Sequence, residues 1–523
     1  MTSANVTGRI ARASGIVMAG VLLSRVLGYF RDWTVAHQSG ANAATDTYYA
    51  AFTLPDFLNY LVAAGALSVT FIPVFSRYMA ENQEDEGWRA FSAVVTVMGL
   101  VVAALVVIGE TFAPQLVAAI APGFAPPAKA QTVFLTRLML PAQIFFYLGS
   151  IFTAVQYAKG QFVVPSLAGV VYNLGVILGG LLLGSRIGIT GFAVGVVAGS
   201  LFGNFLLQIY GARRAGARFT PNLNVRHPGF RWFIRLSIPI MLALSLPATD
   251  DWIIRWFGSF LGRASITWLN YAKTLMRVPL GVVGMSVGVA SFPFMAQLYS
   301  EGKLDELKRT LNATLKGLLV PLLPISALSI AQSTPLVHFL FSHTRLQGGD
   351  FDATAAALRV FSISMFAWAA QNILARAFYA TRDTITPAVV GTGITFLSLP
   401  AYWWLAHHYQ YLGLAAASSL GIIVCTVILL VLLNRRIRNR ETGALLVFFL
   451  KISAISTLAG LACFVLNNWL GSRLGWQTTH QALLVLVIVS SVGVLLIALL
   501  AKLFRVKEFE DYARRVFGKV LRS

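Results

Sequence analysis

The sequence predicts an all-α membrane protein with fourteen membrane-spanning helices, and three observations lead to this fold class. Charged residues make up 12% of the 523-residue chain and the mean hydropathy is +0.71, whereas soluble globular proteins carry about 25% charged residues. Apolar runs of about 20 residues, the length that crosses a bilayer as a helix, recur along the whole chain. When these runs are counted as spans, the densest basic clusters all fall on one side, as the positive-inside rule requires: Arg213–Arg235, Arg435–Arg440 and Lys502–Arg522.

The expected spans follow one another with short polar breaks between them. The basic start of the chain resembles a signal peptide, but the first apolar run is long and contains Arg25, which favours a retained first helix. The even number of spans and the side of the basic clusters place both termini in the cytoplasm. The spans are expected at residues 14–37, 46–77, 90–112, 132–158, 163–185, 188–212, 232–260, 265–298, 310–331, 353–380, 385–407, 411–433, 448–470 and 479–503.

An internal repeat predicts how the spans are organised. Chance identity is an alternative in so biased a composition, but two nearly equal offsets favour duplication. An offset of six spans gives a parallel repeat, a common transporter plan, with a cleft between two six-helix lobes. The expected lobes are residues 1–220 and 221–440, and residues 441–523 carry two further C-terminal helices. The identities are Ile151/Ile373, Tyr157/Tyr379, Ala158/Ala380, Pro165/Pro387 and Gly169/Gly391 at an offset of 222, and Pro73/Pro293 and Glu81/Glu301 at an offset of 220.

Three charges lie in the first span, in the stretch SRVLGYFRDW at residues 24–33. Seven residues make about two helical turns, so Arg25 and Asp32 share one face, and Ser24 and Arg31 share the next. Gly28 lies between both pairs, and small residues at this spacing permit close helix approach or leave room for a ligand. Charges at this depth are costly and usually face a bundle interior or a wet cavity.

Two interpretations of the first span remain open. Because a guanidinium fork matches phosphate oxygens, Arg25 and Arg31 are candidates for an anion site in a cleft. The alternative is a structural ion pair, in which Arg31 binds Asp32 or Asp46 and joins two helices.

The seventh and eighth spans carry a second group of charges. Asp251 and Arg255 stand in the i, i+4 order that favours a helical ion pair, and an internally neutralised pair is one interpretation. The other assigns Asp250, Asp251 and Arg255 to the coupling of a proton or sodium ion to transport. Lys273 and Arg277 are like-charged neighbours on one helix face, so the sequence predicts either an anion between them or separate acidic partners.

Motifs of enzymes and of metal sites are weak in this chain. Asp350 and Asp352 form a DxD pattern, which holds a metal and a diphosphate in sugar transferases but also occurs where an acidic residue caps a helix. Cys425 and Cys463 both lie in expected spans and form no zinc spacing or disulfide framework. The sequence has no phosphate-binding loop of an ATPase and no serine-hydrolase elbow. We therefore expect no catalytic residue, no bound metal and no cofactor.

Five segments together resemble one known family, that of MurJ (MviN). They are SRVLGYFRDW, GANAATDTYYAAFTLPDFL, FIPVFSRYMAE, MRVPLGVVGMSVGVASFP and FYATRDTITP, and their order and spacing match along the first twelve spans. The resemblance implies the fold of the multidrug/oligosaccharidyl-lipid/polysaccharide exporters, with two six-helix lobes and two helices that form a hydrophobic groove. It also implies flipping of lipid II, the undecaprenyl-pyrophosphate-linked peptidoglycan precursor, across the bacterial cytoplasmic (inner) membrane.

Where the motifs match, the resemblance implies that residues of this chain have the roles of their counterparts in the family. Some positions of this chain depart from the family pattern. Relatives often have Arg and Glu where this chain has Tyr60 and Ala64, and Arg where it has Thr274. The positive charge has moved to Lys273 and Arg277. An acid on the seventh span with polar partners on the eleventh and twelfth, described as a sodium site in some relatives, is not evident in this sequence.

The candidate residues fall into three groups, and the expected partners follow from the resemblance. Those partners are lipid II, membrane lipids, a coupling ion and wall-synthesis proteins, but not nucleic acid, because the net charge of +21 follows membrane topology. The alternatives are an exporter of another polyprenyl-pyrophosphate-linked glycan and a drug or cation exporter of the same fold. The candidates are Arg25, Arg31, Lys273 and Arg277 for pyrophosphate, Ser24, Gly28, Asp32, Asp46 and Thr267 for the cavity wall or ion pairs, and Asp250, Asp251 and Arg255 for coupling.

Overall fold

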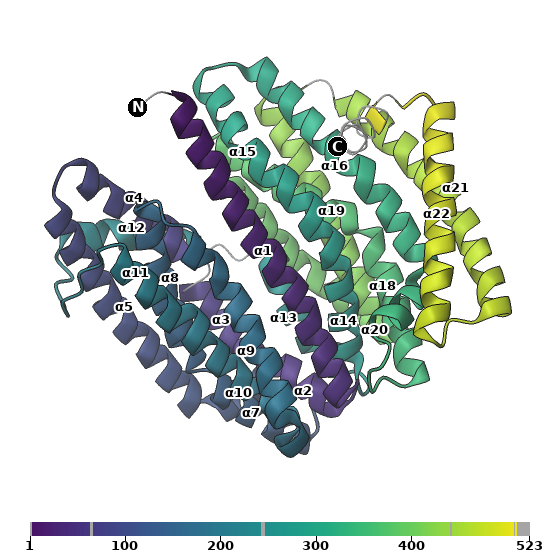
Figure 1. Cartoon of the computed structure of the whole chain (residues 1–523), viewed down its shortest axis with the longest axis horizontal. Helices are drawn as coiled ribbons and strands as arrows, with labels where there is room; N and C mark the ends of the chain where they lie inside the picture. The colour runs from purple at the N-terminus through teal and green to yellow at the C-terminus, as the bar shows by residue number, and fades with distance from the viewer. Residues whose placement is uncertain (1–2, 63–65, 242–245, 440–441, 507, 510–523) are drawn as a thin grey trace. The chain divides into compact units, whose positions relative to one another are not determined.

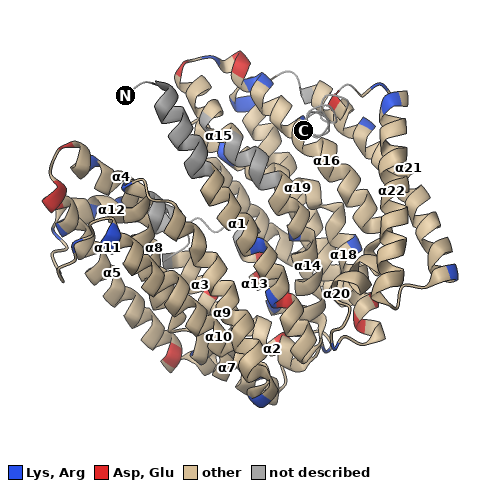
Figure 2. Cartoon of the chain, viewed as in Figure 1, with Lys and Arg blue, Asp and Glu red and all other residues tan. Residues whose placement is uncertain are grey.

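The computed structural model describes residues 3–62, 66–241, 246–439, 442–506 and 508–509. The side chains of residues 3–14, 62–69, 239–248, 284–290, 293 and 442 lie outside this description, and with them Ala64. Every regular element in the described ranges is a helix (Figure 1). In both units, charged residues lie mainly towards helix ends and loops (Figure 2), as expected for helices that cross a lipid bilayer.

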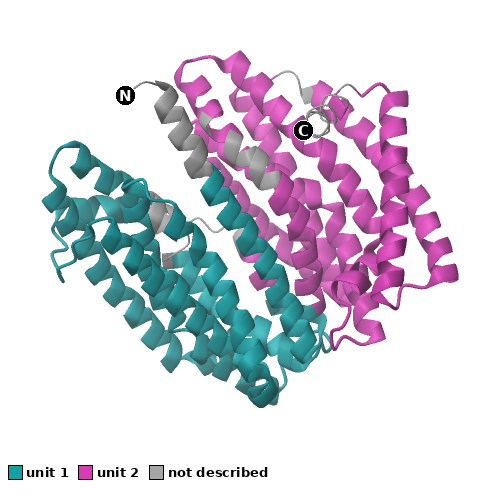
Figure 3. Ribbon diagram, viewed as in Figure 1, with its two compact units in different colours: residues 1–244, 254–267 teal, residues 245–253, 268–523 magenta. Residues whose placement is uncertain are grey.

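Contacts between residues divide the chain into two compact units (Figure 3). Unit 1 comprises Met1–Leu244 and Ile254–Thr267, and unit 2 comprises Ser245–Ile253 and Trp268–Ser523. Helices α13 (Leu246–Gly258) and α14 (Ser265–Pro279) therefore contribute residues to both units. The expected boundaries after residues 220 and 440 stay a prediction.

Unit 1 contains the first twelve α-helices and one π-helical turn. Their core consists of buried hydrophobic side chains and includes the aromatic residues Phe71, Phe91 and Tyr147. The helices are α1 (Ser3–Ser39), α2 (Ala43–Ala51), α3 (Thr53–Val62), α4 (Ala66–Ala80), α5 (Glu84–Thr111), α6 (Ala113–Ile120), α7 (Pro126–Met139), α8 (Ala142–Ala158), α9 (Val163–Ile187), α10 (Thr190–Gly199), η1 (Ser200–Leu206), α11 (Leu207–Arg214) and α12 (Pro228–Met241).

Two helices of unit 1 meet backbone to backbone. A Cβ atom added to Gly175 of α9 would lie 2.4 Å from the Cα atom of Gly199, and one added to Gly179 would lie 2.5 Å from that of Gly195. Because no side chain fits between these surfaces, glycine is required along this contact. Small residues at helix interfaces are how membrane helices approach closely.

Unit 2 continues with η2 and eight α-helices. The longest of these is interrupted at Gln410, whose φ of 53° and ψ of −134° are not helical. The interruption lies between the expected spans 385–407 and 411–433 and splits this long helix into two. The helices are η2 (Leu280–Gly284), α15 (Met285–Ser300), α16 (Leu304–Ala331), α17 (Ser333–Leu340), α18 (Gly348–Ile363), α19 (Met365–Ala380), α20 (Ile385–Arg436), α21 (Thr442–Leu474) and α22 (Thr479–Leu503).

Eight helices in the described residues are long and apolar enough to cross a membrane, or nine if α18 and α19, which meet at 44°, form one bent span. The interrupted helix α20 corresponds to two expected spans. In the described residues the remaining expected spans correspond to shorter helices or, in α1, to a helix whose expected span carries three charges. The polytopic all-α class is confirmed, while the count of fourteen spans stays a prediction.

The helix ends recur at the offsets found in the sequence. The ends of α8 and α19 are 222 residues apart, and so are the starts of α9 and α20. Helices α5 and α16 have 28 residues each and are 220 residues apart at both ends. The turns also correspond: Gly160 and Arg382 have φ of 71° and 59°, and Asn82 and Gly302 have φ of 56° and 73°. These correspondences support the predicted duplication, which stays a prediction.

One of these turns is held by an acid outside the spans. The carboxylate of Asp383 accepts hydrogen bonds from the backbone N–H of Ile385 and Thr386 and from the Thr386 hydroxyl, at 3.1, 2.9 and 2.7 Å. Arg436 lies 2.9 Å from it. Burial alone would raise the pKa of Asp383, but the Thr386 hydrogen bonds and the Arg436 charge outweigh burial and lower it. The ionised carboxylate therefore fixes the start of α20.

Candidate functional site

Arg31 in helix α1 is paired with its neighbour Asp32. The Nε and Nη2 atoms of Arg31 lie 3.0 and 2.9 Å from Oδ1 of Asp32, whose side chain is buried. Nη1 of Arg31 also lies 3.5 Å from the amide oxygen of Asn173 on helix α9. The structure shows the pair of Arg31 with Asp32, but both residues belong to α1, so this pair does not join two helices as expected, and the anion site stays a prediction.

The small residues of α1 pack against helix α9. A Cβ atom added to Gly169 would lie 2.5 Å from Oγ of Ser24, and one added to Gly28 would lie 3.9 Å from Oδ1 of Asn173. The Asn173 side-chain amide donates to the carbonyl oxygen of Ser24 at 3.1 Å. Ser24 therefore serves the close approach of two helices, whereas a side chain at Gly28 would meet only an ordinary contact and leaves the other expected role, room for a ligand, open.

Arg25 lies two turns before Asp32 on the same uninterrupted helix. Asp32 is buried, whereas Arg25 is exposed. The shared helix face predicted for these two residues follows from the continuous helix, but the burial along that face changes with depth. Arg25 is more accessible than Arg31, the other arginine of the expected first span.

Asp46 of helix α2 fixes the start of helix α14. Its buried carboxylate accepts hydrogen bonds from the backbone N–H groups of Ala264 and Thr267, at 2.7 and 2.8 Å, and from the Thr267 hydroxyl at 2.6 Å. Ala264 has a φ of 69°, so the chain turns sharply just before the helix. Asp46 binds the unpaired N–H groups of a helix N-terminus rather than Arg31.

Arg255 of helix α13 pairs with Asp56 of helix α3. Nη1 of Arg255 lies 2.8 Å from Oδ2 of Asp56, and the arginine side chain is only 11% exposed. Among the described contacts, Asp251 is instead bound by Lys273 and Arg277. The i, i+4 pair of Asp251 and Arg255 was the wrong partnership, because tertiary contacts supplied both residues with other partners.

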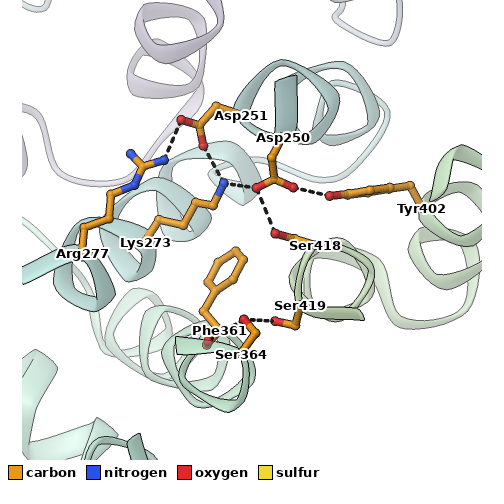
Figure 4. A network of polar contacts seen from close by, with 9 residues as sticks. All are labelled: Asp250, Asp251, Lys273, Arg277, Phe361, Ser364, Tyr402, Ser418 and Ser419. Atoms are coloured by element: carbon orange, nitrogen blue, oxygen red, sulfur yellow. Dashed lines mark hydrogen bonds and ion pairs between the residues drawn. The ribbon is translucent and has the colours of Figure 1, made fainter. Parts of the chain in front are cut away.

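Five polar side chains of unit 2 form a network on three helices (Figure 4). Asp250 of α13 accepts hydrogen bonds from Lys273 of α14 and from the hydroxyls of Tyr402 and Ser418 of α20. Lys273 also lies 2.5 Å from Oδ1 of Asp251. Tyr402 and Ser418 stand on opposite sides of the interruption at Gln410, so the network joins both halves of α20 to α13 and α14.

The network is closed by Arg277 and by two aromatic rings. Nη2 of Arg277 lies 2.7 Å from Oδ2 of Asp251, so this carboxylate bridges the two cations. The Lys273 ammonium lies 5.7 Å from the ring centre of Phe361 and 5.6 Å from that of Trp368, within the range of cation–π attraction. With two acids and two bases the network is formally neutral, which is how charges are tolerated inside a membrane protein.

Two expectations for this region are corrected by these contacts. Lys273 and Arg277 have acidic partners, as one interpretation predicted: Lys273 pairs with Asp250, but both cations also share Asp251, so their acids are only partly separate. The acid of the seventh span does have polar partners on the eleventh and twelfth, namely Tyr402 and Ser418. The sequence did not reveal them because nothing along a 52-residue helix shows which of its hydroxyls face a helix about 150 residues away.

Asp350 of the DxD pattern caps a helix. Its Oδ2 accepts the backbone N–H of Gln347 at 2.8 Å, and its Oδ1 accepts the indole N–H of Trp268 at 3.0 Å. The carboxylate thus completes a capping box at the start of α18. The capping interpretation of this motif is confirmed.

Sequence reasoning missed three polar residues inside the spans. Arg359 of α18 donates to the hydroxyls of Ser333 and Thr334, at 2.6 and 2.8 Å. Arg376 of α19 donates to the amide oxygen of its neighbour one turn earlier, and Asn173 binds α1 as described above. Both arginines stand inside the expected span 353–380, so their charge was the signal that could have identified them.

Comparison with known proteins places the chain among membrane transporters. The family model described as lipid II flippase MurJ matches residues 35–487. The lipid II flippase MurJ of Burkholderia cenocepacia is 27% identical over 473 residues, which cover 88% of this chain and 92% of that relative.

Two solved structures show the same fold. The structure of a lipid II flippase MurJ in an inward closed conformation matches with a TM-score of 0.77 and 22% identity, covering 93% of this chain and 98% of that one. An inward-facing multidrug resistance transporter of the MATE family, from the MOP superfamily, matches with a TM-score of 0.61 and 15% identity, covering 82% and 98%. The chain therefore has the polytopic fold that these transporters share.

Proposed function

Because the chain belongs to the family of lipid II flippases called MurJ, we propose that it moves lipid II from the inner to the outer leaflet of a bacterial cytoplasmic membrane. The observation that carries this proposal is the family match over residues 35–487, which spans both units. The relatives are transporters, and lipid II is the substrate that their names give. The protein works by alternating access, as the two-unit transporter plan implies.

The candidate contacts for the pyrophosphate of the substrate are the accessible arginines of the expected spans, taken in each unit by itself. Arg25 is exposed, Arg31 is 29% exposed beside its buried partner Asp32, and Arg277 is 42% exposed. Guanidinium forks suit phosphate oxygens because they present parallel N–H donors. Lys273 is only 3% exposed and is held by two carboxylates, so it acts through Asp251 and Arg277 and not by direct contact.

Orientation and energy supply follow from charge. The basic clusters at Arg213–Arg235 and Lys502–Arg522 support cytoplasmic termini through the positive-inside rule. The membrane potential, at about 2.3 kcal/mol per charge per 100 mV, supplies a force on the cationic residues of an unloaded transporter.

Asp250 and Asp251 are the candidates for ion coupling. Wall-synthesis proteins are candidate partners for the cytoplasmic surface.

A transport assay with purified protein tests the substrate. Proteoliposomes loaded with labelled lipid II are expected to expose the label on the opposite leaflet in a protein-dependent way. Undecaprenyl-pyrophosphate carrying a different glycan and a cationic dye serve as competing substrates. Movement of the dye but not of lipid II would contradict the proposal and favour a cation exporter of the same fold.

Arg25→Ala tests the assigned anion contact. Loss of an exposed cation that binds a pyrophosphate is expected to lower lipid II movement at least about tenfold, the effect of losing one charge-assisted hydrogen bond of about 1.5–3 kcal/mol. Arg89→Ala is the matched control, because Arg89 lies on the cytoplasmic side in an exposed pair with Glu86. Equal transport by Arg25→Ala and wild type would remove Arg25 from the site.

A further inference from the structure

The charge network of unit 2 has two halves that differ in their access to water. Asp250 and Lys273 are 1% and 3% exposed, whereas Asp251 and Arg277 are 33% and 42% exposed. Five ion pairs in the described residues join two residues of the expected spans. Among these five pairs, only Asp251 and Arg277 both have side chains that are more than a quarter exposed. A ligand in water can therefore reach both members of this pair.

The bridging carboxylate can leave Arg277 without exposing a buried charge. Oδ1 of Asp251 contacts Lys273 at 2.5 Å and Oδ2 contacts Arg277 at 2.7 Å, so each oxygen serves a different cation. If Oδ2 moves away from Arg277, the ammonium of Lys273 keeps Asp250 and its contact with Oδ1. An uncompensated buried charge, which would cost several kcal/mol, does not arise.

The guanidinium of Arg277 can bind a phosphate group in place of the Asp251 carboxylate. A carboxylate and a phosphate group both present two oxygens that match parallel N–H donors. A pyrophosphate carries more charge than a carboxylate, so it competes better for Arg277 than an ordinary monovalent anion does. The exposed half of the network is therefore built to give up its carboxylate to a ligand of higher charge.

We propose that Asp251 is a built-in competing anion, which occupies Arg277 in the unloaded protein and must be displaced there by the pyrophosphate of the substrate. This inference rests on the proposed function and names a residue that sets the affinity of its anion contact. Asp251 lowers the affinity by the same factor for every anion that must displace it, so only an anion with a high intrinsic affinity for Arg277, such as a pyrophosphate, still binds. Its return to Arg277 also assists release of the substrate after transport.

Binding of inorganic pyrophosphate to the purified full-length protein tests this role. Titration calorimetry is expected to show about tenfold tighter binding to Asp251→Asn than to wild type, because the amide keeps the shape but removes the competing charge. Arg277→Gln is expected to weaken binding about tenfold, and Asp251→Asn combined with Arg277→Gln to show no gain over Arg277→Gln. Monovalent acetate is expected to bind more weakly than pyrophosphate to both proteins, and to gain from Asp251→Asn by a factor no larger than that for pyrophosphate.

Two further variants separate competition from structural damage. Asp250→Asn changes the neighbouring carboxylate in the same way, and it is expected to lower thermal stability without any gain in pyrophosphate affinity. Asp251→Glu keeps the negative charge and is expected to keep the wild-type affinity. It supplies the test in place of Asp251→Asn if that variant does not fold, because a gain in affinity with Asp251→Glu would overturn the proposal.

The outcomes distinguish this inference from the proposed function. Unchanged pyrophosphate affinity in folded Asp251→Asn overturns the competing role, and so does unchanged affinity in Arg277→Gln. In either case wild-type protein that still moves lipid II in proteoliposomes leaves the proposed function standing. Wild-type protein that binds pyrophosphate through Arg277 but moves no lipid II contradicts the proposed function instead.

Discussion

Replacement of Lys273 by methionine removes the cation from the centre of the unit 2 network while keeping a side chain of similar length. Asp250, whose side chain is 1% exposed, then loses the ammonium that it binds, whereas Asp251 keeps its ion pair with Arg277. Breaking a buried ion pair by removal of one partner costs about 3–5 kcal/mol. Because Asp251 is one-third exposed and its share is screened, we expect the lower end, about 3 kcal/mol of unfolding free energy.

Thermal unfolding in detergent, followed by tryptophan fluorescence, measures this loss. Lys316→Met is the matched control, because Lys316 also pairs with an acid, Glu508, and lies 5.2 Å from the ring centre of Phe448. That pair is 27% and 38% exposed, so its loss is expected to cost about 0–1 kcal/mol. Combining Lys273→Met with Asp250→Asn is expected to restore at least about 1 kcal/mol by removing the uncompensated carboxylate. If Lys273→Met unfolds at the temperature of the control, the network does not carry the charge balance described here.

Two other predictions concern acids outside the network. Asp350→Ala together with Asp352→Ala is expected to lower stability by about 0.5–2 kcal/mol through loss of the α18 cap and to leave lipid II transport unchanged; loss of transport at normal stability would revive the DxD motif as a chemical site. The lowered pKa of Asp383 means that its contribution to stability is present above pH about 4, the value in the unfolded chain, and is lost as the pH falls further. The stability difference between wild type and Asp383→Asn should therefore shrink between pH 6 and pH 3, and a constant difference would show that the ionised carboxylate is not what holds the turn.

The sequence was sufficient for features that depend on local periodicity. The apolar runs predicted the class of fold, and the identities at an offset of 222 include Ala158 and Ala380, which are the last residues of two corresponding helices. Helical spacing also placed Arg25 and Asp32 on one face of α1. Each of these follows from residues within about ten positions of one another.

The partners of the membrane charges depended on contacts distant in sequence. Arg255 found Asp56, which lies 199 residues earlier, in place of its helical neighbour Asp251. Asp250 found Tyr402 and Ser418, 152 and 168 residues later. A charge that stands inside a bilayer must be neutralised, and that requirement can be deduced from the sequence, but its partner is chosen by packing.

The paired turns show that different residue types can end a helix in the same way. At corresponding positions the chain has Gly160 and Arg382, and both residues have a left-handed backbone. For a residue with a side chain this conformation costs about 1–2 kcal/mol relative to the right-handed one. At both turns the next backbone N–H group returns to the helix, from Gln161 to the carbonyl oxygen of Gln156 at 2.8 Å and from Asp383 to that of Phe378 at 2.9 Å. These hydrogen bonds satisfy carbonyl groups that the helix end leaves open, so they offset the cost at Arg382 and let the residue type vary while the chain path stays the same.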